Sequence, residues 1–276
     1  MGLFDGCLLA SDVDDTLVDN GYINPANIEK IDFFMNEGGM FSLSSGRGSG
    51  ALLPVLEKLN NVSPCVTTNG TVIYDYKNSI FLSQKFIPKS DYAFPKKIGE
   101  LDRNIAIEIH CGFDILVTAQ TQEGIDHQVY ERLNPIMVSY EEACQRNWNK
   151  VLYMCETKQD REFIKEFVSK ENSMSDFVET SAVIYGRMRY YFEQIPKDVS
   201  KFTALKELCE ILNVKKGGLF AIGDYYNDVE MLKNADISAS PCESPENVKK
   251  YADYITVSCK DGAVADFIDY LTERLK

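Results

Sequence analysis

The chain has 276 residues, of which 45% are hydrophobic and 26% charged, so it can bury a sizeable core as one large domain or two. Its net charge of −13 and pI near 4.7 argue against nucleic acid or an anionic membrane as partner, because phosphate groups are bound by surplus Lys and Arg. The sequence shows no signal-peptide pattern and no run of eighteen apolar residues, and its eight cysteines form no CxxC or Cys/His pair. We therefore expect a cytoplasmic protein with reduced thiols.

The first predicted strand ends in a group of aspartates. Residues 7–10 form a short apolar run, typical of a strand buried in a parallel sheet, and Asp12, Asp14 and Asp15 follow it. Ligands of open α/β sheets bind outside the carboxyl ends of the strands, so Asp12 and Asp14 are expected to lie together at a functional site. Taken alone, the stretch also fits a surface turn in which Asp side chains bind their own backbone.

Strands and helices then alternate. The expected elements are a helix from Pro25 to just before Gly38, a strand at 40–44, a glycine-rich turn at 44–50, a helix at 51–59, a strand at 64–67, and a hairpin of strands at 72–74 and 80–82. This order predicts a right-handed βαβ series with a small β appendage.

The pattern changes in the middle of the chain. The expected elements are an antiparallel strand pair at 105–110 and 115–118, a helix at 123–133, a strand at 151–155, a helix at 159–168, and closing strands at 182–185 and 188–195. This order is typical of an α+β domain. With hinges near Pro88 and Pro196, it predicts an inserted domain at 86–194.

The alternation resumes after the second hinge. The expected elements are helices at 201–212, 229–233 and 245–251, strands at 219–222, 237–239 and 254–256, and a last helix that begins near Gly262. The predicted fold class is therefore α/β, with a Rossmann-like parallel-sheet core formed by residues 1–85 and 195–276 and the inserted α+β domain between them.

Four segments carry groups suited to reactions of phosphate esters. They are Asp12 and Asp14 with Thr16, then Ser45-Gly46-Arg47, then Lys201 at a helix start, and last the GDYYND loop at 223–228. Each is unspecific alone, since a lysine at a helix start is usually solvated and a GDxxND loop can be a capped turn. Taken together and in this order, the four segments are a strong indication of phosphate chemistry.

Together these segments resemble the motifs of the haloacid dehalogenase-like (HAD) hydrolase superfamily, in particular its Cof-type branch with a type IIB cap. DVDDTL resembles the DxDGTL motif, Ser45-Gly46-Arg47 the TGR motif, Asn69-Gly70 the NG turn, Lys201 the lysine of the third motif, and GDYYND the GDxxND motif. The resemblance covers nearly the whole chain. It implies a Mg²⁺-dependent phosphatase that acts through an aspartyl-phosphate, with residues 86–194 as a substrate-selecting cap.

Phosphoryl transfer requires an in-line nucleophile, a metal and fixed donors, and these residue types supply all three. Asp12 is the expected nucleophile, and Asp14 the expected acid and base. The expected phosphate-binding residues are Ser45, Gly46, Asn69, Lys201 and Asn227, and Ser45 and Lys201 are also counted as catalytic. The expected Mg²⁺ ligands are Asp12, Asp224, Asp228 and the backbone oxygen of Asp14. For Asp228 the alternative role is to orient metal-bound water or Lys201.

Some residues depart from the motifs or lie outside them. Asp15 stands where the family most often has glycine, and it adds a negative charge beside the site. His110, His127 and Trp148 are interpreted as structural residues. Arg187, Arg189 and Tyr191 alternate along the last strand of the inserted domain, where they face either a substrate or solvent.

The expected reaction is hydrolysis of a small phosphorylated metabolite, with sugar phosphates favoured and nucleotide or cofactor phosphates next. A phosphomutase or phosphotransferase that uses the same intermediate is the nearest alternative. A non-catalytic regulatory protein that holds phosphate on Asp12, or binds a phosphorylated ligand, is the other alternative, although such a switch gains nothing from Asp14 as an activator of water. We expect a monomer or small homo-oligomer without nucleic-acid or membrane partners.

Overall fold

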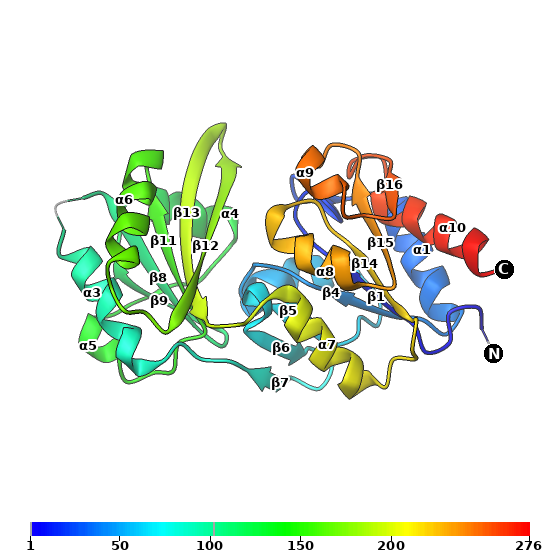
Figure 1. Ribbon diagram of the computed structural model, residues 1–276, viewed down its shortest axis with the longest axis horizontal. Coiled ribbons are helices and arrows are strands. Elements are labelled where there is room, and N and C mark those ends of the chain that lie inside the picture. The colour runs from blue at the N-terminus through cyan, green and yellow to red at the C-terminus, as the bar shows by residue number, and fades with distance from the viewer. Residues whose placement is uncertain (1, 102) are drawn as a thin grey trace. The chain divides into compact units, whose positions relative to one another are not determined.

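The computed structural model describes residues 2–101 and 103–276, and the chain separates into two compact units (Figure 1). Unit 1 contains the residues up to Arg47 together with Leu53–Ser83 and Ser200–Lys276. Unit 2 contains Gly48–Leu52 and Gln84–Val199.

Unit 1 is built on a five-stranded parallel sheet with strand order β16-β15-β14-β1-β4. Its strands are β1 (Leu8–Ser11), β4 (Met40–Leu43), β14 (Leu219–Ile222), β15 (Ile237–Pro241) and β16 (Tyr254–Thr256). The central strands β1 and β14 are buried at every position, as expected for a parallel sheet covered on both faces.

Helices cover both faces of this sheet (Figure 1). They are α1 (Pro25–Asn36) and α10 (Ala263–Leu275) on one face, and α7 (Lys201–Leu212) and α8 (Val229–Asn234) on the other, with α9 (Glu246–Lys249) preceding β16. Leu205 and Leu208 of α7 pack in one cluster with Leu8 of β1 and Leu219 of β14. Ser200 caps α7 by accepting a hydrogen bond from the Thr203 N–H, which fixes where this helix begins.

The segment after β4 differs from the prediction in two ways. The helix expected at 51–59 is a short 3₁₀ turn (Ser49–Leu52) followed by α2 (Leu53–Leu56), because Pro54 has no N–H to extend a longer helix. The strand β5 (Cys65–Thr67) pairs antiparallel with β6 (Val72–Asp75) in a separate three-stranded sheet with β7 (Ile80–Gln84).

The expected parallel βαβ order is kept at β5, because the bridge between Ser44 and Val66 is parallel and the Ser45 N–H donates to the Val66 carbonyl. The regular pairing of β5, however, is the antiparallel one with β6. The pairing with β6 results from the turn that follows β5. Asn69 and Gly70 both have positive φ angles, 56° and 99°, and they reverse the chain at once into β6. A small hairpin of β2 (Val18–Asp19) and β3 (Tyr22–Ile23) follows the first aspartates and was not predicted.

Unit 2 is an α+β unit with a six-stranded sheet of order β10-β9-β8-β11-β13-β12. Its strands are β8 (Ile105–Cys111), β9 (Asp114–Ala119), β10 (Ile136–Met137), β11 (Lys150–Cys155), β12 (Ser175–Ile184) and β13 (Arg187–Pro196), and its helices are α3 (Ala93–Gly99), α4 (Gln122–Tyr130), α5 (Tyr140–Ala143) and α6 (Lys158–Ser169). All neighbouring strands run antiparallel except β10 and β9. The predicted fold class is confirmed.

The two faces of the unit 2 sheet differ in chemistry. One face is apolar, and its cluster includes Ile107, Ile109, Tyr153 and Phe192 together with the fully buried Trp148, whose indole stacks on Tyr92. The opposite face carries buried polar side chains that alternate with the apolar set along the strands. We call Glu108, His110, Lys150, Arg189 and Glu193, with His127 of α4, the unit 2 cluster.

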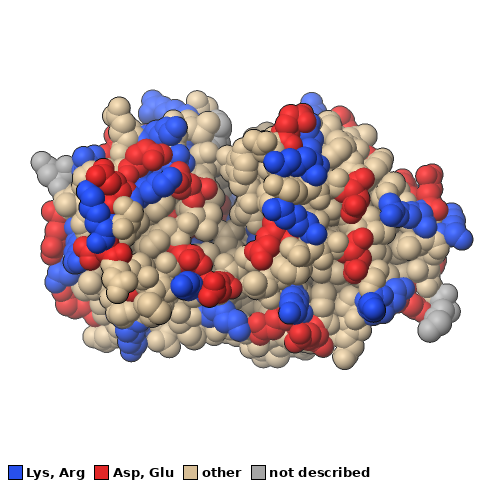
Figure 2. Space-filling model, viewed as in Figure 1, with Lys and Arg blue, Asp and Glu red and all other residues tan. Residues whose placement is uncertain are grey.

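Positive and negative side chains are interspersed over the visible surface, with no extended basic patch in this view (Figure 2). Among the described residues, no helix has both the length and the apolar composition that a membrane crossing requires.

Candidate active site

A buried lysine joins two of the motifs at the carboxyl edge of the parallel sheet. Asp12 follows β1, Asp228 ends the 3₁₀ turn after β14, and Lys201 is the first residue of α7. The Lys201 Nζ donates to Asp12 Oδ1 and to Asp228 Oδ1, each at 2.6 Å. All three residues are buried. The capped start of α7 therefore delivers its first side chain between two carboxylates.

The GDYYND loop folds around the carboxylate of Asp228. The Asp228 Oδ2 accepts hydrogen bonds from the backbone N–H groups of Asp224 and Tyr225, both at 3.1 Å. A Cβ atom at Gly223 would lie 2.6 Å from the Asp228 Cγ, so only glycine fits there. Thr16 contributes from the first motif, because its Oγ1 donates to Asp224 Oδ1 at 3.1 Å. The loop thus brings Asp224 and Asp228 to the same place.

Asp12, Asp224 and Asp228 form a group that could hold a metal ion, with one oxygen from each within 4.8 Å of the others. Burial, together with the charge of Asp228, raises the pKa of Asp12 to about 7. Burial and the charges of Asp12 and Asp228 also raise the pKa of Asp224. Burial disfavours the charged form of Lys201, but Asp12 and Asp228 outweigh it and raise the pKa of Lys201.

Three carboxylates thus surround a single ammonium group in this cluster. The excess negative charge and the all-oxygen donor set fit a hard divalent cation such as Mg²⁺. Of the four predicted metal ligands, the structure groups Asp12, Asp224 and Asp228. The fourth predicted ligand is the backbone oxygen of Asp14, which stays a prediction, and the Asp14 carboxylate accepts hydrogen bonds from Arg47.

The remaining predicted phosphate-binding residues lie in three loops, which follow β4, β5 and β14. The buried Ser45 accepts the Arg47 N–H on its Oγ at 3.1 Å, and its own N–H donates to the Val66 carbonyl. The Asn227 amide donates to Asn69 Oδ1 at 3.1 Å, and a Cβ atom at Gly46 would lie equally close to that oxygen. Gly46, Asn69 and Asn227 therefore form one polar group.

Gly70 connects this group to the lysine. A Cβ atom at Gly70 would lie 2.1 Å from the Ser200 carbonyl oxygen, so the turn after β5 can pack against the start of α7 only because this residue is glycine. The structure thereby brings the NG turn and Lys201 together, as the order of the motifs led us to expect.

Sequence reasoning assigned no role to Arg47, although it lies in the Ser45-Gly46-Arg47 motif. Its guanidinium donates to both oxygens of Asp14, from Nε at 2.9 Å and from Nη2 at 2.6 Å. The chemistry of the residue could have suggested a carboxylate partner, because the planar fork of arginine matches a carboxylate in a two-bond pair, but not which carboxylate.

Asp15 occupies a left-handed backbone position with φ 54°, which explains why glycine suits this position and why Asp is tolerated. Partial burial and the neighbouring carboxylates of Asp14, Asp19 and Glu243 raise the pKa of Asp15.

In unit 2 the structure decides between the two interpretations of the last strand. Arg189 and Tyr191 are buried, so a solvated strand face is wrong for these two side chains, whereas Arg187 is exposed. The reason is that α4 contributes an acidic partner, Asp126, to which the Arg189 Nη2 donates. His110 and His127 are also buried, in the unit 2 cluster.

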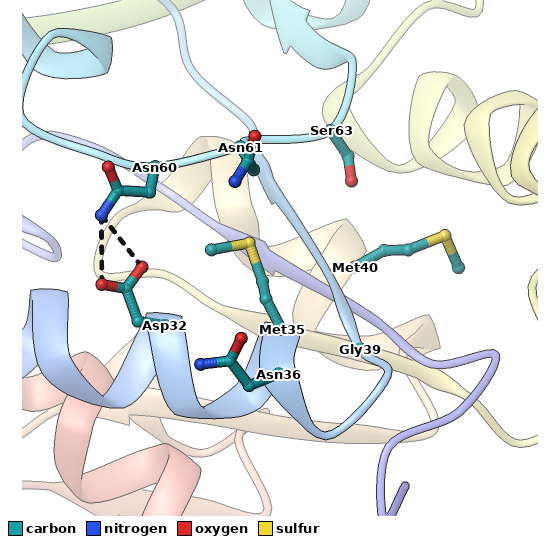
Figure 3. A pocket seen from close by; sticks show the side chains of 8 residues that line it. All are labelled: Asp32, Met35, Asn36, Gly39, Met40, Asn60, Asn61 and Ser63. Carbon is teal, nitrogen blue, oxygen red and sulfur yellow. Dashed lines mark hydrogen bonds between the residues drawn. The ribbon is translucent and has the colours of Figure 1, made fainter. Parts of the chain in front are cut away.

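A separate pocket of about 540 Å³ lies on unit 1, where α1 ends and β4 begins (Figure 3). Two of its lining residues are hydrogen-bonded, because the Asn60 amide donates to both carboxylate oxygens of Asp32 (Figure 3). None of the predicted site residues lines it, because the motif residue Ser45 follows the opposite end of β4.

Comparison with known proteins supports the resemblance seen in the motifs. The family model described as haloacid dehalogenase-like hydrolase matches residues 9–268. A protein of Streptococcus pyogenes serotype M6 is 26% identical over 95% of this chain and 96% of its own length. The 5-amino-6-(5-phospho-D-ribitylamino)uracil phosphatase YwtE of Bacillus subtilis is 22% identical over 95% of this chain and 97% of its own length.

A solved structure described as a sugar phosphatase of HAD subclass IIB matches with a TM-score of 0.82 at 18% identity, covering 96% of this chain and 99% of that one. At this identity the likeness concerns the fold. The predicted family, fold and hydrolase class are confirmed, and the names of the relatives agree with a phosphatase. The chain belongs to the haloacid dehalogenase-like hydrolase family.

Proposed function

We propose that this hydrolase is a Mg²⁺-dependent phosphatase that removes the phosphate of a small phosphorylated metabolite through an aspartyl-phosphate on Asp12. The observation that carries the proposal is the buried Lys201, which donates to Asp12 and Asp228 within a group of three carboxylates. Such a group combines a nucleophile, a fixed cation and a place for a metal, which are the requirements of phosphoryl transfer.

Asp12 is the proposed nucleophile. Its carboxylate oxygen attacks phosphorus, the bond from phosphorus to the ester oxygen breaks, and Asp14 gives that oxygen a proton. Water then attacks the phosphorus of the aspartyl-phosphate, Asp14 takes its proton, and Asp12 is regenerated together with free phosphate. The hydrogen bond from Lys201 orients Asp12 and favours its ionised form against burial, and the second hydrogen bond, to Asp228, holds the ammonium group in place for both steps.

The metal site consists of Asp12, Asp224 and Asp228, with the backbone oxygen of Asp14 as a further ligand. Bound Mg²⁺ would neutralise the charge of the transferred phosphoryl group. Thr16 and the backbone N–H groups of Asp224 and Tyr225 orient the acidic side chains.

The phosphate oxygens are bound by Lys201 and Ser45, and by Gly46 and the paired amides of Asn69 and Asn227 in the polar group beside them. The Ser45 hydroxyl accepts from the Arg47 N–H and keeps its own proton available for a phosphate oxygen.

We assign catalysis to residues 1–85 and 195–276, and selection of the substrate to a cap formed by residues 86–194. The unit 2 cluster and the neighbouring Tyr191 support a polar substrate, with sugar phosphates favoured. The side chains of His110 and Tyr191 are buried. Within the described residues, the two ring nitrogens of His110 and the hydroxyl of Tyr191 have no hydrogen-bond partner. Buried polar atoms of this kind require partners, which hydroxyl groups of a substrate can provide.

A panel of phosphate esters with and without Mg²⁺ tests the proposed function, with release of phosphate as the readout. We expect Mg²⁺-dependent hydrolysis, highest for sugar phosphates. Asp12→Asn is expected to lower kcat by at least about 1,000-fold, because nucleophile and orienting groups act as a unit. Asp269→Asn is the matched control, since it also removes an aspartate that pairs with a lysine, Lys30, but on the surface of unit 1.

Full activity in Asp12→Asn would contradict the mechanism. Transfer of labelled phosphate to a sugar hydroxyl instead of water would identify a phosphomutase or phosphotransferase. Stable phosphorylation without release would identify a regulatory protein. We also propose a cytoplasmic location, supported by eight cysteines that form no disulfide within the described residues, and a monomer or small homo-oligomer.

A further inference from the structure

The contact between Asp14 and Arg47 joins two loops that lie 33 residues apart in the chain. Arg47 donates from Nε to Asp14 Oδ2 and from Nη2 to Asp14 Oδ1, so both carboxylate oxygens are held by one rigid plane. This geometry fixes the orientation of the carboxylate as well as its position.

The two side chains differ in exposure. The side chain of Asp14 is 49% exposed, whereas that of Arg47 is 14% exposed. A half-exposed carboxylate on a short side chain samples several rotamers unless something holds it. Arg47 is the better fixed partner, and it can therefore restrict Asp14.

The backbone of Arg47 is itself anchored. Its N–H donates to the Ser45 Oγ at 3.1 Å, and its carbonyl accepts the Thr68 N–H at 2.8 Å. These bonds tie Arg47 to the phosphate-binding loop and to the turn after β5. The orientation of Asp14 is thus coupled to the loops that surround the phosphate.

We infer that Arg47 is a positioning residue that orients the Asp14 carboxylate for proton transfer; this inference rests on the proposed function. Arg47 stays protonated and exchanges no proton itself. Each oxygen of Asp14 has a further lone pair beyond the one that accepts from Arg47, so the proton passes between that oxygen and the ester oxygen or the attacking water.

Leaving groups of different acidity test this role. An alkoxide leaves only with a proton from Asp14, whereas p-nitrophenolate leaves without one. The measurement is the single-turnover rate of leaving-group release for p-nitrophenyl phosphate and for an alkyl phosphate, so that hydrolysis of the intermediate does not contribute. Wild type, Arg47→Gln, Arg47→Lys, Asp14→Asn and the Asp14→Asn/Arg47→Gln double variant are compared.

We expect Arg47→Gln to lower the rate for the alkyl phosphate by about 10–100-fold, within the range of general acid catalysis, and the rate for p-nitrophenyl phosphate by less than about 5-fold. Arg47→Lys, which keeps the charge and one hydrogen bond, is expected to fall between wild type and Arg47→Gln. The double variant is expected to be no slower than Asp14→Asn, because Arg47 acts through Asp14. The KM values are expected to stay unchanged.

Arg146→Lys is the matched control, because it weakens an arginine–aspartate pair on the surface of unit 2. Equal losses on both esters, a raised KM, or additive losses in the double variant would overturn the inference and assign Arg47 to phosphate binding or to stability. Unchanged single-turnover rates of Arg47→Gln for both esters would overturn the inference as well. If wild type hydrolyses no ester, the proposed function fails and this inference fails with it, whereas an active wild type with unaffected Arg47 variants refutes the inference alone.

Discussion

Each of the two units buries a group of charged side chains, and the two groups are balanced differently. In unit 1, Asp12, Asp224 and Asp228 surround a single lysine, so negative charge is in excess. In unit 2, opposite charges are matched: Lys150 lies 3.2 Å from Glu193, and His127 lies 3.3 Å from Glu108. The group in unit 1 therefore could hold a cation from solution, whereas the ion pairs of the unit 2 cluster balance each other.

The unmatched groups in unit 2 are of another kind. Both nitrogens of His110 and the hydroxyl of Tyr191 are buried without a hydrogen bond to any described residue. Among the charged groups, unit 1 therefore gathers carboxylates around one ammonium group, whereas unit 2 matches opposite charges and also buries these neutral polar atoms. This difference in charge balance agrees with the proposed division, in which unit 1 performs phosphoryl transfer and unit 2 recognises the rest of the substrate.

The largest expected effect comes from removal of the buried cation of unit 1. Lys201→Met leaves Asp12 and Asp228 facing each other, and we expect a loss of about 3–5 kcal/mol in the free energy of unfolding without metal. We also expect kcat to fall at least about 1,000-fold. Urea denaturation and phosphatase assays measure the two effects. If Lys201→Met without metal were as stable as the wild type, the ammonium group would not balance these carboxylates.

Removal of the metal is expected to abolish turnover and to lower the stability of unit 1. A ligand at about 100 times its Kd stabilises a protein by about 2.7 kcal/mol, so EDTA is expected to lower the thermal midpoint and added Mg²⁺ to restore it. The response is expected to disappear in Asp224→Asn, which lacks one carboxylate of the group. Equal Mg²⁺ stabilisation of Asp224→Asn and wild type would place the metal elsewhere.

The matched pair of unit 2 is expected to behave differently from the lysine of unit 1. Lys150→Met breaks a buried ion pair and is expected to cost about 3 kcal/mol, while Lys150→Met with Glu193→Leu is expected to recover much of that loss. Neither variant is expected to change kcat for p-nitrophenyl phosphate by more than about 3-fold. A 100-fold loss would place Lys150 in the chemistry and remove the contrast between the units.

The two histidines of unit 2 are expected to give a smaller, pH-dependent effect of opposite sign. Burial disfavours the charged form of His127, but Glu108 outweighs it and raises the pKa of His127, so its stabilisation is present at low pH and is lost as pH rises through that pKa. Burial, together with Lys150, lowers the pKa of His110, so stability is lost as pH falls below about 6.5.

Each slope is at most about 1.4 kcal/mol per pH unit, because one proton is exchanged. Urea denaturation across pH 5–9, with His127→Gln and His110→Gln, measures both slopes. His127→Gln is expected to remove the loss at high pH, and His110→Gln the loss at low pH. If the loss at high pH persists in His127→Gln, or the loss at low pH in His110→Gln, the titration belongs to another group.

Much of unit 1 could be predicted from sequence because parallel strands bring their carboxyl ends to one edge. The motif order therefore placed Asp12, Lys201 and Asp228 in loops that the structure brings together, and helix α7 has the predicted bounds Lys201–Leu212. The roles of these residues in catalysis remain predictions.

Other features could not be predicted because they depend on contacts between distant segments. The Asp14–Arg47 pair requires two loops to meet with one geometry, which no local pattern encodes. The polar alternation of Arg189 and Tyr191 is the same for a solvated face and for a buried polar face, and only the packing of α4 decides between them. The pairing of β5 likewise depends on the tight turn at Asn69 and Gly70.

The most direct test of the central claim is to locate the phosphoryl group on the protein. Asp14→Asn keeps the nucleophile but lacks the base for the second step, so incubation with p-nitrophenyl phosphate and Mg²⁺ is expected to accumulate the phosphorylated enzyme. Mass spectrometry of its acid-stabilised peptides is predicted to find one phosphoryl group on Asp12. A phosphoryl group on another residue, or none while p-nitrophenol is still released, would contradict the account.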